Sequence, residues 1–207
     1  MVQTKNKKIA ILIESHYDGN ETAAFETFFP VKGYEIEYVS NLRGKPEKVF
    51  ADNNNPSNTI TVTKDITTDV ILDNYTGVFL IGGYAMDMLR YEVEVEEGEH
   101  GRPKEIPVAT QFAKAALENP EIIVGAICHA LWIFTPVPEC LQGRRVTCGH
   151  NIMYDVLNTG AILDYSGPHK KLAAVCVDRN LVTGRHPFVV QDFMDVYLDE
   201  LNKKHQH

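Results

Sequence analysis

The chain has 207 residues, of which 44% are hydrophobic and 23% charged, and this composition suits one globular domain with a full core. Its formal net charge of −8 argues against a nucleic-acid-binding protein, because binding a phosphate backbone needs clustered Lys and Arg. No apolar run approaches the length of a membrane span. The N-terminus carries no cleavable signal, so we expect a cytoplasmic protein without a membrane partner.

The first quarter of the chain alternates between strand and helix patterns. Residues 8–14 form a short apolar run typical of a buried parallel strand. Residues 21–32 have apolar side chains at helical spacing and end at Gly33, and residues 34–39 form a second strand pattern. A strand, a helix and a strand in this order predict a parallel pair joined by a crossover helix.

The next segments are less regular. Residues 43–58 are polar and contain Asn53-Asn54-Asn55-Pro56, which predicts a surface excursion, and residues 59–63 are predicted to be a short edge strand. Residues 77–81 are typical of a third buried strand, and the pair Gly82-Gly83 follows it.

A second insertion, over residues 84–106, contains the acidic run YEVEVEEGEH at residues 91–100. Five glutamates in ten residues indicate a solvated segment. Because the segment directly follows the glycine pair, a lid over the site or a contact between subunits is an alternative role for it.

The second half of the chain continues the alternation of helices and strands. The patterns predict helices over 107–117, 151–160 and 188–201 and from residue 130, a strand over 122–127, and a strand pair over 172–183. We therefore predict a single α/β domain over residues 1–207. Its doubly wound, mostly parallel sheet should carry helices on both faces.

The four cysteines are Cys128, Cys140, Cys148 and Cys176, and no two of them form a C-x-x-C motif. This spacing excludes a zinc knuckle and a thioredoxin-like redox motif. No His, Asp or Glu spacing typical of a metal site stands out either. We predict thiols in a reducing compartment and no metal or other cofactor.

Cys128 stands between two apolar segments, in the sequence EIIVGAICHALWIF over residues 121–134. It ends a predicted strand after the small residues Gly125 and Ala126, a pattern that resembles the nucleophile elbow of α/β hydrolases. We expect the helix that begins at His129 to place its positive end near the sulfur and to lower the thiol pKa. A plain strand-to-helix turn is the alternative.

Several groups are predicted to gather around this thiol, because the carboxyl ends of parallel strands share one crevice. Backbone N–H groups of Gly82, Gly83 and Ala130 are candidates for binding an oxyanion. Either His129 or Glu21 is the candidate for moving a proton, and adjacent residues such as Cys128 and His129 do not normally face each other on a helix. A Glu21 carboxyl that is neutral near pH 7 could donate to the sulfur or to an intermediate.

These motifs together resemble those of the ThiJ/PfpI superfamily, a flavodoxin-like branch of the class I glutamine-amidotransferase-like fold. The resemblance covers about residues 7–201. It is carried by the elbow G-A-I-C-H-A, the glycine pair, Glu21 followed by Gly33, the stretch from Thr147 to Gly160, and the sequence LVTGRHP at residues 181–187.

The resemblance implies further site residues and an assembly. Asp18 is an acidic candidate by its position. His150 lies within one residue of a position that lines the site in some relatives, and Arg185 matches an arginine that ends a family strand. A homodimer or higher homo-oligomer is implied as well. The acid of a Cys-His-acid triad is not identified here, and a neighbouring subunit is one possible source. The chain departs from many relatives at Ile81 and Trp132.

The resemblance implies three alternative functions. The first is a cysteine-dependent, stress-related enzyme that acts on small reactive carbonyls, like glyoxalase III or a deglycase. The second is a PfpI-like cysteine peptidase or amidase. The third is a non-enzymatic redox sensor or chaperone that uses oxidation of Cys128.

Overall fold

A computed structural model describes residues 7–91 and 105–205 of the chain. Its centre is a six-stranded sheet with the order β2-β1-β5-β6-β10-β9, in which only β9 runs antiparallel to its neighbour. The strands are β1 (Lys8–Leu12), β2 (Glu35–Val39), β5 (Gly77–Leu80), β6 (Ile123–Ile127), β9 (Val175–Asp178) and β10 (Leu181–Gly184). The predicted mostly parallel sheet is thus confirmed.

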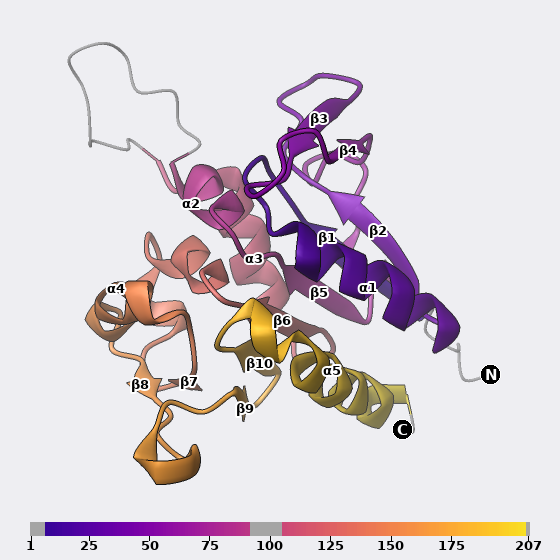
Figure 1. The fold of residues 1–207 in the computed structure, drawn as a ribbon. Coiled ribbons are helices and arrows are strands. Elements are labelled where there is room, and N and C mark those ends of the chain that lie inside the picture. Colours follow the sequence, from indigo (N-terminus) through magenta and orange to yellow (C-terminus); the bar gives the residue numbers. More distant parts are fainter. Residues whose placement is uncertain (1–6, 92–104, 206–207) are drawn as a thin grey trace.

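Helices cover both faces of this sheet (Figure 1). The helices α1 (Gly19–Val31) and α5 (Val190–His205) contact each other on one face, and α3 (Val108–Glu118) packs against β5 and β6 on the other. Two shorter helices are α2 (Ala85–Arg90) and α4 (Met153–Asn158). None of the helices in the described residues is long and apolar enough to cross a membrane.

Aromatic side chains fill the layer between the sheet and the α1–α5 pair. Phe25 stacks on Phe79 with 3.8 Å between ring centroids, and Phe193 and Tyr197 continue the cluster. Gly125 on β6 lies beneath these rings, and a Cβ atom there would come within 3.0 Å of Phe193. Each fully buried ring of this kind contributes about 1.5–3 kcal/mol, so β6 is held firmly against its neighbours.

The polar segment over 43–58 is more ordered than the sequence predicts. Its residues Lys48–Ala51 form β3, which pairs antiparallel with β4 (Thr59–Val62). The short strand predicted over residues 59–63 is thus present as β4, but it belongs to a separate hairpin and not to the central sheet (Figure 1). A strand of four residues is too short for its alternation of apolar and polar side chains to show whether it pairs with the central sheet or with a hairpin partner.

Two further elements differ from the prediction. The helix α2 falls inside the predicted insertion over 84–106, and its six residues are too few to show a helical period. The segment Ala130–Phe134 is a fully buried 3₁₀ helix instead of the start of an α-helix. The acidic run from residue 92 onward lies outside the described residues, so its role stays a prediction.

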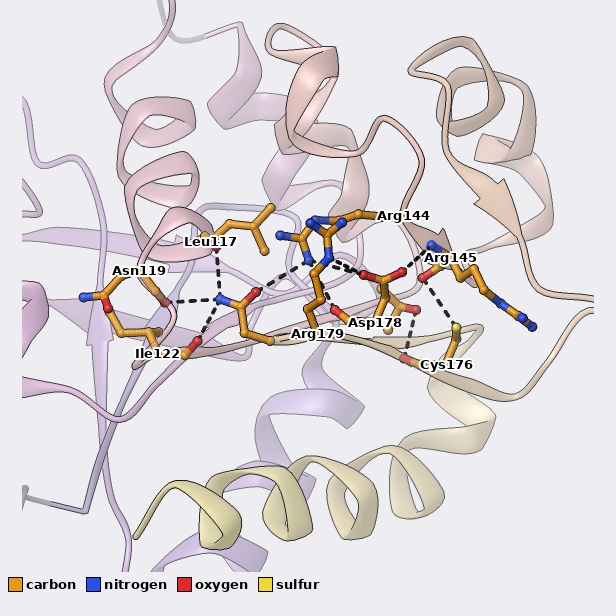
Figure 2. Close-up of polar contacts among 10 residues, drawn as sticks. Leu117, Asn119, Ile122, Arg144, Arg145, Cys176, Asp178 and Arg179 are labelled. Atoms are coloured by element: carbon orange, nitrogen blue, oxygen red, sulfur yellow. Dashed lines mark hydrogen bonds and ion pairs between the residues drawn. The ribbon is translucent and has the colours of Figure 1, made fainter. Parts of the chain in front are cut away.

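The amino ends of β6 and β10 are joined by a buried polar network around Asn180, whose partners Leu117, Asn119 and Ile122 are labelled in Figure 2. The Asn180 side-chain NH₂ group donates to the backbone carbonyls of Leu117, Asn119 and Ile122 at 3.0, 3.2 and 3.1 Å. This one amide therefore connects the turn between β9 and β10 to the end of α3 and the start of β6.

A small parallel pair of strands, β7 (Arg145–Val146) and β8 (Ile162–Leu163), lies beside β9. The loop after β7 leads back to the carboxyl ends of the central strands. The Gly149 N–H donates to the Cys128 carbonyl at 2.8 Å. This bond brings the residues that follow Gly149 next to the elbow.

Candidate active site

Cys128 lies at the carboxyl end of β6 in a backbone conformation that favours glycine. Its φ angle is 58°, which is uncommon for a residue with a Cβ atom and marks a strained turn. The Cys128 N–H donates to the Gly184 carbonyl at 2.9 Å, and this bond helps to hold the strain. The sequence predicted a tight turn at this residue, and the structure has one.

The Cys128 side chain is mostly buried, with 7% of its surface exposed, yet it lines a cavity of about 420 Å³. The cavity opens over the carboxyl ends of the strands, where ligands bind in open α/β sheets. Four other predicted site residues also line it, namely Asp18, Gly83, His129 and His150. The thiol is therefore reachable from solvent through this cavity.

Glu21 lies fully buried on the first turn of α1, and it acts on Cys128 through its charge without lining the cavity. Its Oε2 accepts the Gly82 N–H at 2.7 Å, and its Oε1 is buried without a hydrogen-bond partner among the described residues. Burial raises the pKa of this carboxyl well above its usual value, the negative charge of Asp18 raises it further, and the Gly82 N–H opposes both. These effects favour the neutral acid that the sequence predicted.

The two glycines after β5 have different roles. The Gly82 N–H is already bound to Glu21, so it does not face the cavity as a donor. Gly83 has a φ of 71°, and a Cβ atom there would lie 2.3 Å from the His16 carbonyl oxygen. The N–H groups of Gly83 and His129 both act on the Cys128 sulfur, which places two donors beside it. Ala130, the other predicted donor, is buried in the 3₁₀ segment.

The expectation of a lowered thiol pKa is wrong. Burial raises the pKa of Cys128 to about 12, negative charge on Glu21 and Asp18 adds to the rise, and the N–H groups of His129 and Gly83 oppose it. The helix expected after the elbow is one short 3₁₀ segment, and so brief an element supplies little dipole. Because Glu21 itself favours its neutral form, we regard burial as the dominant cause.

Both ring nitrogens of His129 face other partners. Nδ1 lies 3.2 Å from the Gly83 carbonyl oxygen, and Nε2 lies 2.7 Å from Oδ1 of Asn151. The ring is also flanked by Tyr84 and Trp132, and burial lowers its pKa. The imidazole is thus fixed in place, but neither nitrogen is hydrogen-bonded to the Cys128 sulfur.

The remaining predicted residues divide between the cavity and its surroundings. Asp18 is the N-cap of α1, and its Oδ1 accepts the N–H groups of Asn20 and Glu21. His150 is exposed at the rim of the cavity. Arg185 does not line the cavity, because its guanidinium donates to the Leu172 carbonyl at 2.7 Å.

The sequence did not point to several other residues that line the cavity. They are mostly amide and aromatic side chains, namely Asn20, Asn53, Asn54, Tyr84, Asn151, His186, Pro187 and Phe188. Asn53 and Asn54 belong to the Asn-rich segment that was predicted to be only a surface excursion. The composition of this segment predicts a turn, but it does not show which part of the folded protein the turn contacts.

A larger cavity of about 710 Å³ lies at the amino ends of the strands, near Arg144, Arg179, Lys203 and Lys204. Each of these cations already has a carboxylate within 4.0 Å: Asp178 for both arginines, Glu200 for Lys203 and Glu121 for Lys204. Each cation at this cavity is thus already paired with a carboxylate, and Cys128 lies at the opposite end of β6. We therefore place the site at the smaller cavity. No group of three or more potential metal ligands occurs within residues 7–91 and 105–205.

Comparison with known proteins identifies the family of this chain. The sequence profile of the DJ-1/PfpI family matches residues 7–200. An uncharacterized protein of Staphylococcus epidermidis is 28% identical over 189 residues, which cover 90% of this chain and 93% of that protein. General stress protein 18 of Bacillus subtilis is 27% identical over 183 residues, with 87% and 90% covered.

Solved structures show the same fold. A ThiJ/PfpI domain protein from Brachyspira murdochii superposes with a TM-score of 0.73 at 18% identity, covering 96% of this chain and 98% of that one. A two-domain protein from Anabaena variabilis, with DJ-1/ThiJ/PfpI-like and ferritin-like domains, gives a TM-score of 0.75 at 24% identity. That match covers 94% of this chain and 50% of the other, so the present chain spans half of the two-domain protein. The chain belongs to the DJ-1/PfpI family.

Proposed function

We propose that this member of the DJ-1/PfpI family is a cofactor-independent enzyme that uses Cys128 to convert small α-dicarbonyl compounds into α-hydroxy acids. The observation that carries the proposal is the pairing of a strained thiol with a buried acid. Cys128 has its sulfur beside two backbone N–H groups, and the buried Glu21 carboxyl has an oxygen without a partner among the described residues.

The reaction balances without an oxidant or a metal. The Cys128 sulfur adds to the aldehyde carbon and the thiol proton goes to the aldehyde oxygen, which gives a hemithioacetal. The hydrogen on that carbon then moves as a proton to the neighbouring ketone carbon, through an enediol, and a thioester results. Water hydrolyses the thioester, releases the α-hydroxy acid and restores the thiol.

Glu21 is the better candidate for the proton transfers. Its neutral form can give a proton to the ketone oxygen, and the resulting carboxylate can take the carbon-bound proton. Both nitrogens of His129 have other partners, so this ring fits a role in shaping the site. The N–H groups of Gly83 and His129 would stabilise negative charge that develops on the substrate oxygen.

The test measures lactate formed from methylglyoxal by the purified full chain. Cys128→Ala should abolish turnover, and Glu21→Gln should lower kcat by about 10²–10⁴-fold, since a general acid–base contributes that much. Glutamine keeps an oxygen that can accept the Gly82 N–H, so circular dichroism should show a folded variant. Cys140→Ser is the matched control, because Cys140 does not line the cavity.

The same preparations distinguish the alternatives. Peptide cleavage that depends on Cys128 would favour a peptidase, although the orientation of His129 away from the sulfur does not favour that class. If neither substrate is turned over and dilute peroxide oxidises Cys128 selectively, a redox role replaces the enzymatic one. Lactate formed equally well by Cys128→Ala would also overturn the proposal.

A further inference from the structure

The loop between β3 and β4 is a fixed wall of the cavity. The Asn53 N–H donates to the Tyr17 carbonyl at 2.8 Å, and the Tyr17 hydroxyl donates to the Asn58 carbonyl at 3.1 Å. Tyr17 is itself fully buried and also forms a bridge to Gly83. The hairpin loop is therefore held against the glycine turn, and it presents Asn53 and Asn54 to the cavity.

Primary amides are the commonest polar side chains among the described residues that line this cavity. Asn20, Asn53, Asn54 and Asn151 all contribute to it, and Asn151 Oδ1 is already close to His129. Asn54 Oδ1 accepts a long bond of 3.4 Å from Asn53, which leaves the Asn54 amide NH₂ and Asn53 Oδ1 available to a ligand. A primary amide both donates and accepts, so it matches a hydroxyl group, which does the same.

The charge of the lining disfavours an anionic ligand. Among the described residues that line the cavity there is no Lys or Arg, Asp18 is the acidic one, and the basic ones are His129, His150 and His186. A carboxylate or phosphate entering it would lose water without gaining a permanent counter-ion and would be repelled by Asp18. The site therefore favours a neutral ligand.

The size and rim of the cavity favour a ligand larger than a three-carbon carbonyl. About 420 Å³ falls in the range of roughly 300–1,000 Å³ typical of pockets for small molecules and cofactors. Phe188 is 93% exposed at the rim, and Tyr84 is 41% exposed there. These rings can pack against the apolar C–H face of a sugar while the amides bind its hydroxyls.

We infer that the preferred substrate is a neutral, sugar-derived α-dicarbonyl with several hydroxyl groups, and that Asn53 and Asn54 recognise those hydroxyls. This inference rests on the proposed function. The chemistry is that of the smaller dicarbonyl: the aldehyde carbon bonds to Cys128, and water releases a polyhydroxylated α-hydroxy acid. The hairpin residues touch only the hydroxylated tail, so they act on specificity and leave the bond-making step unchanged.

The first test compares kcat/KM for glucosone, a hydroxylated dicarbonyl, with kcat/KM for methylglyoxal. Wild type should prefer glucosone, and Asn53→Ala and Asn54→Ala should each lower kcat/KM for glucosone by about 3–10-fold, the effect of losing one net hydrogen bond. The same variants should lower kcat/KM for glucosone by a larger factor than kcat/KM for methylglyoxal, because methylglyoxal has no hydroxyl to lose. Asn55→Ala is the matched control, since Asn55 lies in the same loop but does not line the cavity.

A binding measurement separates this inference from the proposed function. Trp132 is the single tryptophan of the chain, and its ring centroid lies 5.0 Å from that of His129, so its fluorescence should report an occupied cavity. In the unreactive Cys128→Ser protein, sorbitol should change this signal and sorbitol phosphate should bind more weakly. Asn53→Ala should weaken the sorbitol response, and Asn55→Ala should not.

The outcomes can be distinguished. Methylglyoxal turnover without a glucosone preference, together with no effect of Asn53→Ala, would overturn this inference and leave the proposed function standing. If no dicarbonyl is turned over, the proposed function fails, and the sorbitol titration alone decides whether the cavity binds hydroxylated ligands. Tighter binding of the phosphorylated polyol would refute the charge argument.

Discussion

The Cys128 thiol is subject to effects that change its pKa in opposite directions. Burial and nearby carboxyl groups raise the pKa, and the N–H groups of His129 and Gly83 lower it. The raising effects are larger, so the pKa of Cys128 is raised to about 12. A thiol with this pKa is almost entirely protonated near pH 7. In the proposed mechanism the thiol therefore depends on its position and on the nearby Glu21 carboxyl, and not on a thiolate that is already present.

This argument predicts the pH dependence of alkylation at Cys128. The thiolate is the nucleophile. As long as the pH stays below the pKa, the thiolate fraction increases about tenfold for each unit by which the pH rises. Iodoacetamide should therefore modify Cys128 at a rate that increases steadily from about pH 6 to pH 10, as followed by mass spectrometry of the Cys128 peptide. A rate that levels off near neutral pH would show that the pKa is low and that the effect of burial has been overstated.

At the scale of elements, the site depends on how closely the turn after β5 approaches the turn after β1. Gly83 is in the left-handed region and lies against the backbone of His16 and Tyr17. The Tyr84 N–H donates to the His16 carbonyl at 2.7 Å across the same contact. This approach positions the Gly83 N–H beside the sulfur, and only a residue without a side chain permits it.

Gly83→Ala should therefore lower the free energy of unfolding by more than the cost of placing an alanine at a left-handed backbone angle. The left-handed angle costs an alanine about 1–2 kcal/mol, and the clash with His16 should bring the total to roughly 2–5 kcal/mol. Gly44→Ala is the matched control, because Gly44 has a φ of 75° but no atom within 4 Å of the added Cβ. Urea unfolding measures both variants, and equal losses would mean that the close approach adds no energy.

At the scale of the whole molecule, the two ends of the sheet differ in structure. The carboxyl ends of the strands form the Cys128 cavity, and the amino ends are joined by the Asn180 network (Figure 2). Asn180 is buried and serves three carbonyls at once, so its loss should affect stability without altering the chemistry.

Asn180→Ala should lower the free energy of unfolding by about 2–4 kcal/mol, because several buried carbonyls lose their donor. For a chain of 207 residues this corresponds to a Tm lower by about 4–16 °C. Activity per folded molecule at a lower temperature should be unchanged. Asn158→Ala, at an exposed position, should change stability by less than about 0.5 kcal/mol, and an equal effect of the two variants would contradict the role of the network.

The local sequence was sufficient for the regular part of the fold. Buried parallel strands are continuous apolar runs, so β1, β5 and β6 were predicted to within one or two residues, and the small residues before Cys128 predicted its turn. The short elements were not predictable, because strands β3 and β7 and helix α2 have too few residues to show a period.

The sequence by itself thus determined the α/β architecture, the family and the position of Cys128 at the end of a strand, because each depends on patterns that are local in the chain. Only the tertiary structure decided the environment of that sulfur. The raised pKa values of Cys128 and Glu21 result from burial by distant segments, and the contact of His129 with Asn151 and the amide wall at Asn53 join residues that are far apart in sequence. Desolvation and cavity shape are properties of the packed molecule, and no short stretch of sequence contains them.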